Sequence, residues 1–181
     1  MLGWEFPPYH SGGLGTACYG LTKGLSSQGV NVTFVLPSLH KNIETDFVKL
    51  IGANIRFKTI DSPISGYMTT ASYKETLTKN APVKNLSTSM YGKDLMQEVE
   101  RFSLRVRTIA KSENFDVIHA HDWLTYKAGI NAKKVSKKPL IVHVHATEFD
   151  RCASDNINQD VYNIERMGMH AADKIIAVSN F

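Results

Sequence analysis

The chain has 181 residues, of which 43% are hydrophobic and 21% are charged, and its formal net charge is +4. This length and composition are typical of one globular domain, and the scattered, modest positive charge argues against a nucleic-acid-binding protein. The sequence has no apolar run of about 20 residues and no signal peptide, and its two cysteines fit no disulfide or metal motif, so we expect a cytoplasmic protein without a transmembrane segment.

The chain begins with a short apolar run over residues 1–4, and two prolines separate this run from a glycine-rich turn that contains Gly12 and Gly13. Apolar positions then recur at helical spacing until about Gly29, which predicts a helix directly after the turn. Backbone N–H groups at the start of a helix donate to anions when no Cβ holds the ligand away. The turn is therefore a candidate phosphate site, and a purely structural tight turn is the alternative.

Short apolar runs alternate with helical patterns along the rest of the chain. We expect strands at residues 32–36, 54–60, 115–119, 140–144 and 174–178, and further helices at residues 95–111, 123–132 and 157–172. Over residues 61–92 we expect loops and a hairpin. The alternation indicates an α/β fold with a Rossmann-like, doubly wound, mostly parallel sheet. Gly20 and Gly24 inside the first helix suggest close packing there.

Histidines gather where the expected strands end. Six of the seven lie at or beyond these ends, where open α/β sheets bind ligands. They are His10, His40, His119, His121, His143 and His145. For any single histidine a structural role is the alternative, and we assign that role to His40 and His170.

The same region suggests a metal site as an alternative, because histidine and aspartate are ligands for zinc or iron. The candidate ligands are His119, His121, Asp122, His143 and His145. A catalytic metal needs about three convergent ligands and an open position, and the spacing matches no two-metal hydrolase, so we expect no metal. Trp123 directly after Asp122 suits another use, because an aromatic wall beside a carboxylate holds hydroxylated ligands such as sugars.

A nicotinamide-dependent dehydrogenase is a further alternative, since residues 13–18 are one residue away from the dinucleotide fingerprint. Two departures argue against it. The fingerprint leaves its strand directly, whereas residues 6–11 form a detour here, and no acidic residue follows the second strand to hold a ribose.

Four segments carry a family resemblance when they are taken in order. They are GWEFPPYHSGGLG at residues 3–15, DVIHAHDW at 116–123, VHVH at 142–145 and ADKIIAVS at 172–179. Together they resemble the N-terminal domain of GT-B glycosyltransferases, in particular the glycogen and starch synthase group and its group 1 relatives. The resemblance implies a retaining transferase that moves a hexose from an ADP- or UDP-linked sugar to a glucan or other hydroxyl acceptor, with no further cofactor.

The resemblance also assigns roles to residues. His145 is expected near the donor sugar, Asp122 at the sugar or acceptor, and Gly12 and Gly13 at the donor diphosphate. The remaining expected donor- and substrate-binding residues are Tyr9, His10, His121 and Trp123. One departure concerns His10, because glycogen synthases typically carry a lysine at this place.

Both ends of the chain resemble cut ends, since the first strand is short and the last strand ends three residues before the chain does. We therefore expect residues 1–181 to be the acceptor-side half of a two-domain enzyme and to be inactive alone. The donor-binding C-terminal domain would be its partner, together with the nucleotide sugar and the carbohydrate acceptor. A non-catalytic carbohydrate- or phosphate-binding module remains the alternative.

Overall fold

The structure is a computed structural model of the chain, and it describes residues 1–7, 13–38, 45–53, 93–152 and 157–180. The strand expected at 54–60 and the loops expected at 61–92 lie outside these ranges, as do Tyr9, His10, Gly12 and His40. The described elements are α1 (Gly13–Ser27), β1 (Thr33–Leu36), β2 (Lys49–Gly52), α3 (Lys93–Ser112), β3 (Ile118–His121), α4 (Trp123–Ser136), β4 (Leu140–Val144), α5 (Glu148–Arg151), α6 (Gln159–Ala171) and β5 (Lys174–Ala177).

The paired strands are parallel, which confirms the mixed α/β fold with parallel strands. β1 pairs with β2, and β4 lies between β3 and β5. Leu2 joins the two groups through parallel bridges to Val35 and Ala120. Its N–H donates to the carbonyl of His119 at 2.7 Å, and its carbonyl accepts from the N–H of His121 at 3.1 Å. The short apolar run at the start of the chain therefore lies between β1 and β3.

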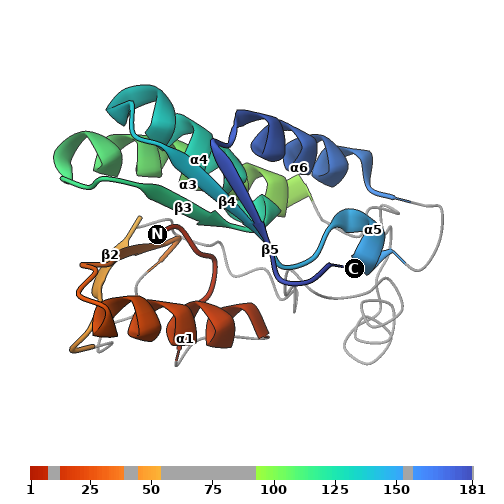
Figure 1. Cartoon of the computed structure of the whole chain (residues 1–181). Helices are drawn as coiled ribbons and strands as arrows, with labels where there is room; N and C mark the ends of the chain where they lie inside the picture. Colours follow the sequence, from red (N-terminus) through yellow and green to blue (C-terminus); the bar gives the residue numbers. More distant parts are fainter. Residues whose placement is uncertain (8–12, 39–44, 54–92, 153–156, 181) are drawn as a thin grey trace, which may run out of the picture.

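Helices lie on both sides of these strands, with α1 on one side and α3, α4 and α6 on the other (Figure 1). Because side chains alternate along a strand, β1 contributes to both cores. Phe34 packs in the cluster that includes Cys18 of α1, whereas Val35 packs in the larger cluster that includes Val99 and Phe102 of α3. Cys18 is a free thiol and is buried in this cluster.

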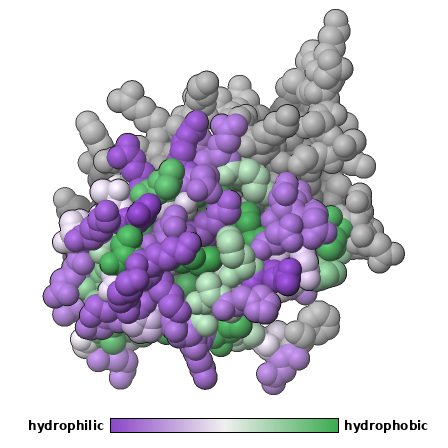
Figure 2. All heavy atoms as spheres, turned by 90° about the horizontal axis from the view of Figure 1, so that it is seen from above, coloured by the Kyte–Doolittle hydropathy of each residue, from purple (hydrophilic) through white to green (hydrophobic). Residues whose placement is uncertain are grey.

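The outer face of the helix layer is mostly polar. Figure 2 shows this face from above, with hydrophilic side chains surrounding scattered apolar ones. The helix expected over residues 95–111 is confirmed as α3, in which Val99, Phe102 and Val106 are buried while Arg101 and Arg105 are exposed. Within the described ranges, none of the helices is long and apolar enough to cross a membrane.

Several predicted boundaries were wrong. β3 begins at Ile118 and not at residue 115, because the first ladder bond runs from the Ile118 N–H to the carbonyl of Pro139, directly before β4. β2 was not expected, since only its pairing with β1 defines these four residues as a strand. The sequence also missed α5, which is too short to show a helical period, and α6 begins at Gln159 and not at residue 157.

The expected close packing at Gly20 and Gly24 was also wrong. Both glycines are exposed, and a Cβ at either would meet no described atom within 4 Å. The close approach occurs instead between α4 and α6, where a Cβ on Gly168 would lie 2.4 Å from the ring of Tyr126. Gly168 therefore lets these two helices pack against each other behind the carboxyl ends of the strands.

Candidate functional site

The carboxyl ends of β3 and β4 bring four histidines together. Because the two strands pair in parallel with His121 opposite His143, the alternate residues on each strand become neighbours. Nε2 of His119 lies 3.2 Å from Nδ1 of His143, and Nδ1 of His121 lies 3.0 Å from Nε2 of His145. We call these four residues the histidine cluster. The parallel pairing of β3 with β4 thus places His121 and His145, at the ends of these strands, in direct contact.

Burial keeps the histidine cluster neutral at pH 7. Loss of solvent, followed by the nearby imidazoles of His143 and His145, lowers the pKa of His119 to about 4. His121 is fully buried, and this burial, followed by the nearby imidazole of His119, holds its pKa well below the usual range. Burial also lowers the pKa of His143 and of His145. A neutral imidazole has one donor and one acceptor nitrogen, so each close pair forms an N–H···N hydrogen bond.

Three members of the cluster have the nitrogen ligands of a metal site, but their rings are not oriented to bind one ion. Nitrogen atoms of His119, His121 and His143 lie within 4.8 Å of one another. The rings of His119 and His143 are nearly parallel, at 4°, and their facing nitrogens point toward each other as hydrogen-bond partners. Zinc would require these lone pairs to converge on a point about 2.0–2.1 Å from each nitrogen. The rings would have to turn before they could bind an ion.

Asp122 links the ends of the two strands. Its carboxylate accepts a hydrogen bond from the N–H of His145 at 2.7 Å, and its own N–H donates to the carbonyl of His143 at 3.0 Å. The backbone of Asp122 has φ 58°, which is strained for a residue other than glycine. The side chain is buried, with 3% of its surface exposed. Asp122 therefore holds the turn that carries His145.

Trp123 lies in the hydrophobic core at the start of α4. Only 1% of its surface is exposed, and it belongs to the larger of the two core clusters. Tyr126, one turn later, donates from its hydroxyl to the carbonyl of His143 at 3.3 Å. Burial raises the pKa of that hydroxyl well above its ordinary value. Tyr126 thus supports the histidine cluster from behind, while Trp123 packs in the core.

Of the expected phosphate-binding turn, the structure describes Gly13. This residue is the first of α1, it is exposed, and a Cβ there would meet no described atom within 4 Å. Its neighbour Leu14 is buried with Phe6, which anchors the start of the helix. Among the described residues, nothing therefore fills the space beside Gly13 that a ligand-binding turn requires.

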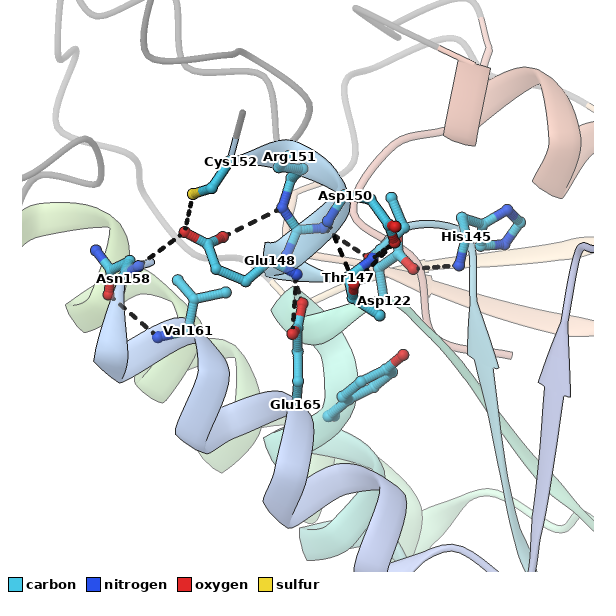
Figure 3. A network of polar contacts seen from close by, with 12 residues as sticks. Asp122, His145, Thr147, Glu148, Asp150, Arg151, Cys152, Asn158, Val161 and Glu165 are labelled. Carbon is cyan, nitrogen blue, oxygen red and sulfur yellow. Dashed lines mark hydrogen bonds and ion pairs between the residues drawn. The ribbon is translucent and has the colours of Figure 1, made fainter. Parts of the chain in front are cut away.

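Sequence reasoning missed a group of buried charges behind His145. Arg151 of α5 forms ion pairs with Glu148 of the same helix and with Glu165 of α6 (Figure 3). The signal in the sequence was the spacing of Thr147 and Asp150, which form a capping box and so mark the start of a helix. The pairing with Glu165 could not be read from that spacing, because it depends on how α6 packs.

Comparison with known proteins identifies the family. The family model described as the starch synthase catalytic domain matches residues 1–181. The chain belongs to the starch synthase catalytic domain family. This match confirms the resemblance to glycogen and starch synthases that the four sequence segments indicated.

Individual relatives within and near the starch synthase family are distant in sequence. The chain is 28% identical over 188 residues to an uncharacterized glycosyltransferase of Methanocaldococcus jannaschii, an alignment that covers 99% of the chain and 39% of that protein. It is 24% identical over 200 residues to a glycogen synthase of Mycobacterium tuberculosis, with 99% of the chain and 41% of that protein covered. A glycogen synthase of Pseudothermotoga lettingae is 29% identical over 164 residues, covering 82% of the chain and 33% of that protein. The chain thus spans well under half the length of these relatives.

Proposed function

We propose that this chain is the N-terminal, acceptor-side half of a GT-B glycosyltransferase with a Rossmann-like sheet. The whole protein would transfer a hexose, with retention of configuration, from an ADP- or UDP-linked sugar to a glucan or another hydroxyl acceptor. One observation carries the proposal: in a chain of the starch synthase family, His145 and Asp122 are joined at the carboxyl ends of adjacent parallel strands. Ligands bind at this edge in open α/β sheets.

The chemistry of the histidine cluster supports a sugar site. A neutral imidazole both donates and accepts hydrogen bonds, which suits contact with hydroxyl groups. The lowered pKa of His145 favours this neutral form. In the proposed enzyme His145 contacts the donor sugar as positive charge develops at its anomeric carbon, with His121 supporting the ring. Asp122 keeps its expected role at the sugar or acceptor.

The proposed diphosphate site lies at the start of α1. N–H groups at Gly12 and Gly13 would donate to the diphosphate, with the positive end of the helix dipole favouring its charge. Tyr9 and His10 stay predictions as further substrate-binding residues. Trp123 was predicted with them, but it is buried in the core with 1% of its surface exposed. The curated relatives are more than twice as long as this chain, and the proposal assigns the stronger donor contacts to a C-terminal domain. We also propose that the enzyme acts in the cytoplasm.

A transferase assay on the full-length protein tests the proposal. The protein is incubated with ADP-glucose or UDP-glucose and a glucan primer, and release of the nucleoside diphosphate and labelling of the glucan are measured. We expect turnover with one donor, and a loss of about 100-fold or more in kcat for His145→Ala without loss of folding. His170→Ala, on the exposed face of α6, is the matched control. If the protein binds oligosaccharide but transfers sugar from neither donor, the proposal of a transferase fails and a carbohydrate-binding module takes its place.

A further inference from the structure

Three charged side chains are buried together behind the turn that carries His145. Glu148, Arg151 and Glu165 have only 0%, 5% and 4% of their surfaces exposed. Removing ions from water is unfavourable unless each is paired and hydrogen-bonded, so a group of this kind needs partners in several directions. The contacts made by the three side chains show which parts of the backbone they fix.

Arg151 is at the centre of the group. Its guanidinium forms an ion pair with Glu165, and its Nε lies 3.4 Å from Oε2 of Glu148. Its Nη1 donates to the carbonyl of Ala146 at 2.7 Å. A planar guanidinium presents donors in fixed directions, and Arg151 uses them on two carboxylates and one carbonyl at once. A lysine ammonium could not reproduce this arrangement.

The two carboxylates in turn hold backbone groups. Oε2 of Glu165 accepts from the N–H of Glu148 at 3.0 Å, so α6 fixes the first residue of α5. Oε1 of Glu148 accepts from the N–H of Asn158 at 3.0 Å and from the thiol of Cys152 at 3.1 Å. Figure 3 shows these contacts running from the start of α6 through α5 to the turn after β4.

This turn is consequently held from both sides. Asp122 accepts from the N–H of His145, and Arg151 donates to the carbonyl of Ala146, the next residue. The two bonds restrict the backbone torsions of His145 and Ala146, which set the direction of the imidazole. The stability of α5 alone does not require three buried charges, because Thr147 and Asp150 already cap this four-residue helix.

We propose that Arg151, oriented by Glu148 and Glu165, is a positioning residue that fixes the direction of the His145 imidazole through the Ala146 carbonyl. Its effect on catalysis rests on the proposed transferase function. Its effect on the direction of the His145 ring is independent of that function, because the ring orientation is measured without turnover. The two effects can therefore be tested separately.

The test compares Arg151→Lys and Glu165→Gln with Arg166→Lys in the full-length protein. Arg166 is the matched control, since it is exposed on α6 next to Glu165. The readouts are the NMR signal of the His145 ring, assigned through its loss in His145→Gln, and kcat and KM for the sugar donor. We expect Arg151→Lys to shift the His145 signal and to lower kcat roughly 10- to 100-fold, with KM changed less than about threefold. Arg166→Lys should change none of these readouts.

An unchanged His145 signal in Arg151→Lys, with wild-type kcat per folded molecule, would overturn the proposal and leave the group a purely structural role. If Arg151→Lys does not fold, Glu165→Gln decides by the same readouts, because it keeps the shape of the side chain while removing its charge and one of its two acceptor oxygens. If the wild-type protein transfers no sugar, the proposed function fails, while the NMR comparison still decides whether Arg151 positions His145.

Discussion

The carboxylate of Asp122 accepts a hydrogen bond from the backbone N–H of His145, with 2.7 Å between Oδ1 and N. Asp122 follows β3 directly and His145 follows β4, so one charge-assisted bond joins the ends of two adjacent strands. At least one role of this carboxylate is therefore to fix the turn that carries the candidate catalytic histidine. Its direct contact with a sugar stays a prediction.

Two substitutions of Asp122 should measure how much its hydrogen bond to the N–H of His145 contributes to stability. Asp122→Asn keeps an acceptor oxygen and the shape of the side chain, so the backbone strain at φ 58° is unchanged, and we expect a loss of no more than about 1 kcal/mol in the free energy of unfolding. Asp122→Ala removes the acceptor, and we expect a loss of about 1.5–3 kcal/mol. Urea unfolding of both variants measures the difference. Equal stability of the two would show that the bond to His145 contributes nothing.

Two glycine-to-alanine substitutions should change the stability of the fold in opposite directions. Gly168→Ala would place a Cβ 2.4 Å from Cδ2 of Tyr126, so α6 must move away from α4, and we expect a loss of about 1–3 kcal/mol. Gly20→Ala adds a methyl group on the exposed side of α1, where no described atom lies within 4 Å of it. Because alanine favours helices, we expect a gain of up to about 1 kcal/mol. Thermal unfolding compares them, and a stable Gly168→Ala would contradict the close approach of the helices.

The sequence pattern predicted those helices and strands whose buried face shows as a regular repeat of apolar residues. The apolar stripe of α3 and the buried run of β4 were visible because a helix or strand that faces a core repeats its apolar residues at its own period. The boundaries of β3 and the existence of β2 were not visible. Both depend on the residues that a neighbouring strand offers for pairing, as at Ile118 and Pro139.

The candidate site divides in the same way. Parallel topology alone predicts that histidines at the ends of adjacent strands meet, and the contacts of His119 with His143 and of His121 with His145 follow from it. The contact between Arg151 and Glu165 could not be predicted, because it joins two helices whose packing is set by shape. The burial of Trp123 likewise depends on how α4 lies against the sheet.

Gly13→Val should weaken binding of the nucleotide sugar without unfolding the chain. The residue is exposed at the start of α1, so the fold has room for the added methyl groups, but a ligand approaching the backbone would meet them. We expect a loss of about tenfold or more in affinity for the donor nucleotide, measured by calorimetry on the full-length protein. Gly13→Ala, with one methyl group, should lose less. Unaltered affinity in Gly13→Val would remove Gly13 from the donor site.

The histidine cluster should bind no metal when the protein is purified. The nearly parallel rings of His119 and His143 are hydrogen-bonded to each other. A metal ion would have to break this hydrogen bond and turn both rings. We expect elemental analysis to find well under one zinc ion per chain, and added zinc to leave the unfolding temperature unchanged. One zinc per chain that disappears in His119→Ala and stays in His170→Ala would instead establish a metal site.

Acid should destabilise the protein partly through His119. Its pKa is about 4 in the folded chain, with burial as the largest cause, and about 6.5 when the chain is unfolded. Between these values the unfolded state binds more protons, so the contribution of His119 to stability is complete above pH 6.5 and is lost as the pH falls toward 4. For this one group the difference is on the order of 3 kcal/mol. Urea unfolding between pH 7.5 and 4.5 should therefore give a smaller loss of stability in His119→Gln than in the wild type, while the exposed His170→Gln keeps the wild-type dependence. Identical dependence in His119→Gln and the wild type would mean that His119 is protonated equally in both states and is not held neutral by the cluster.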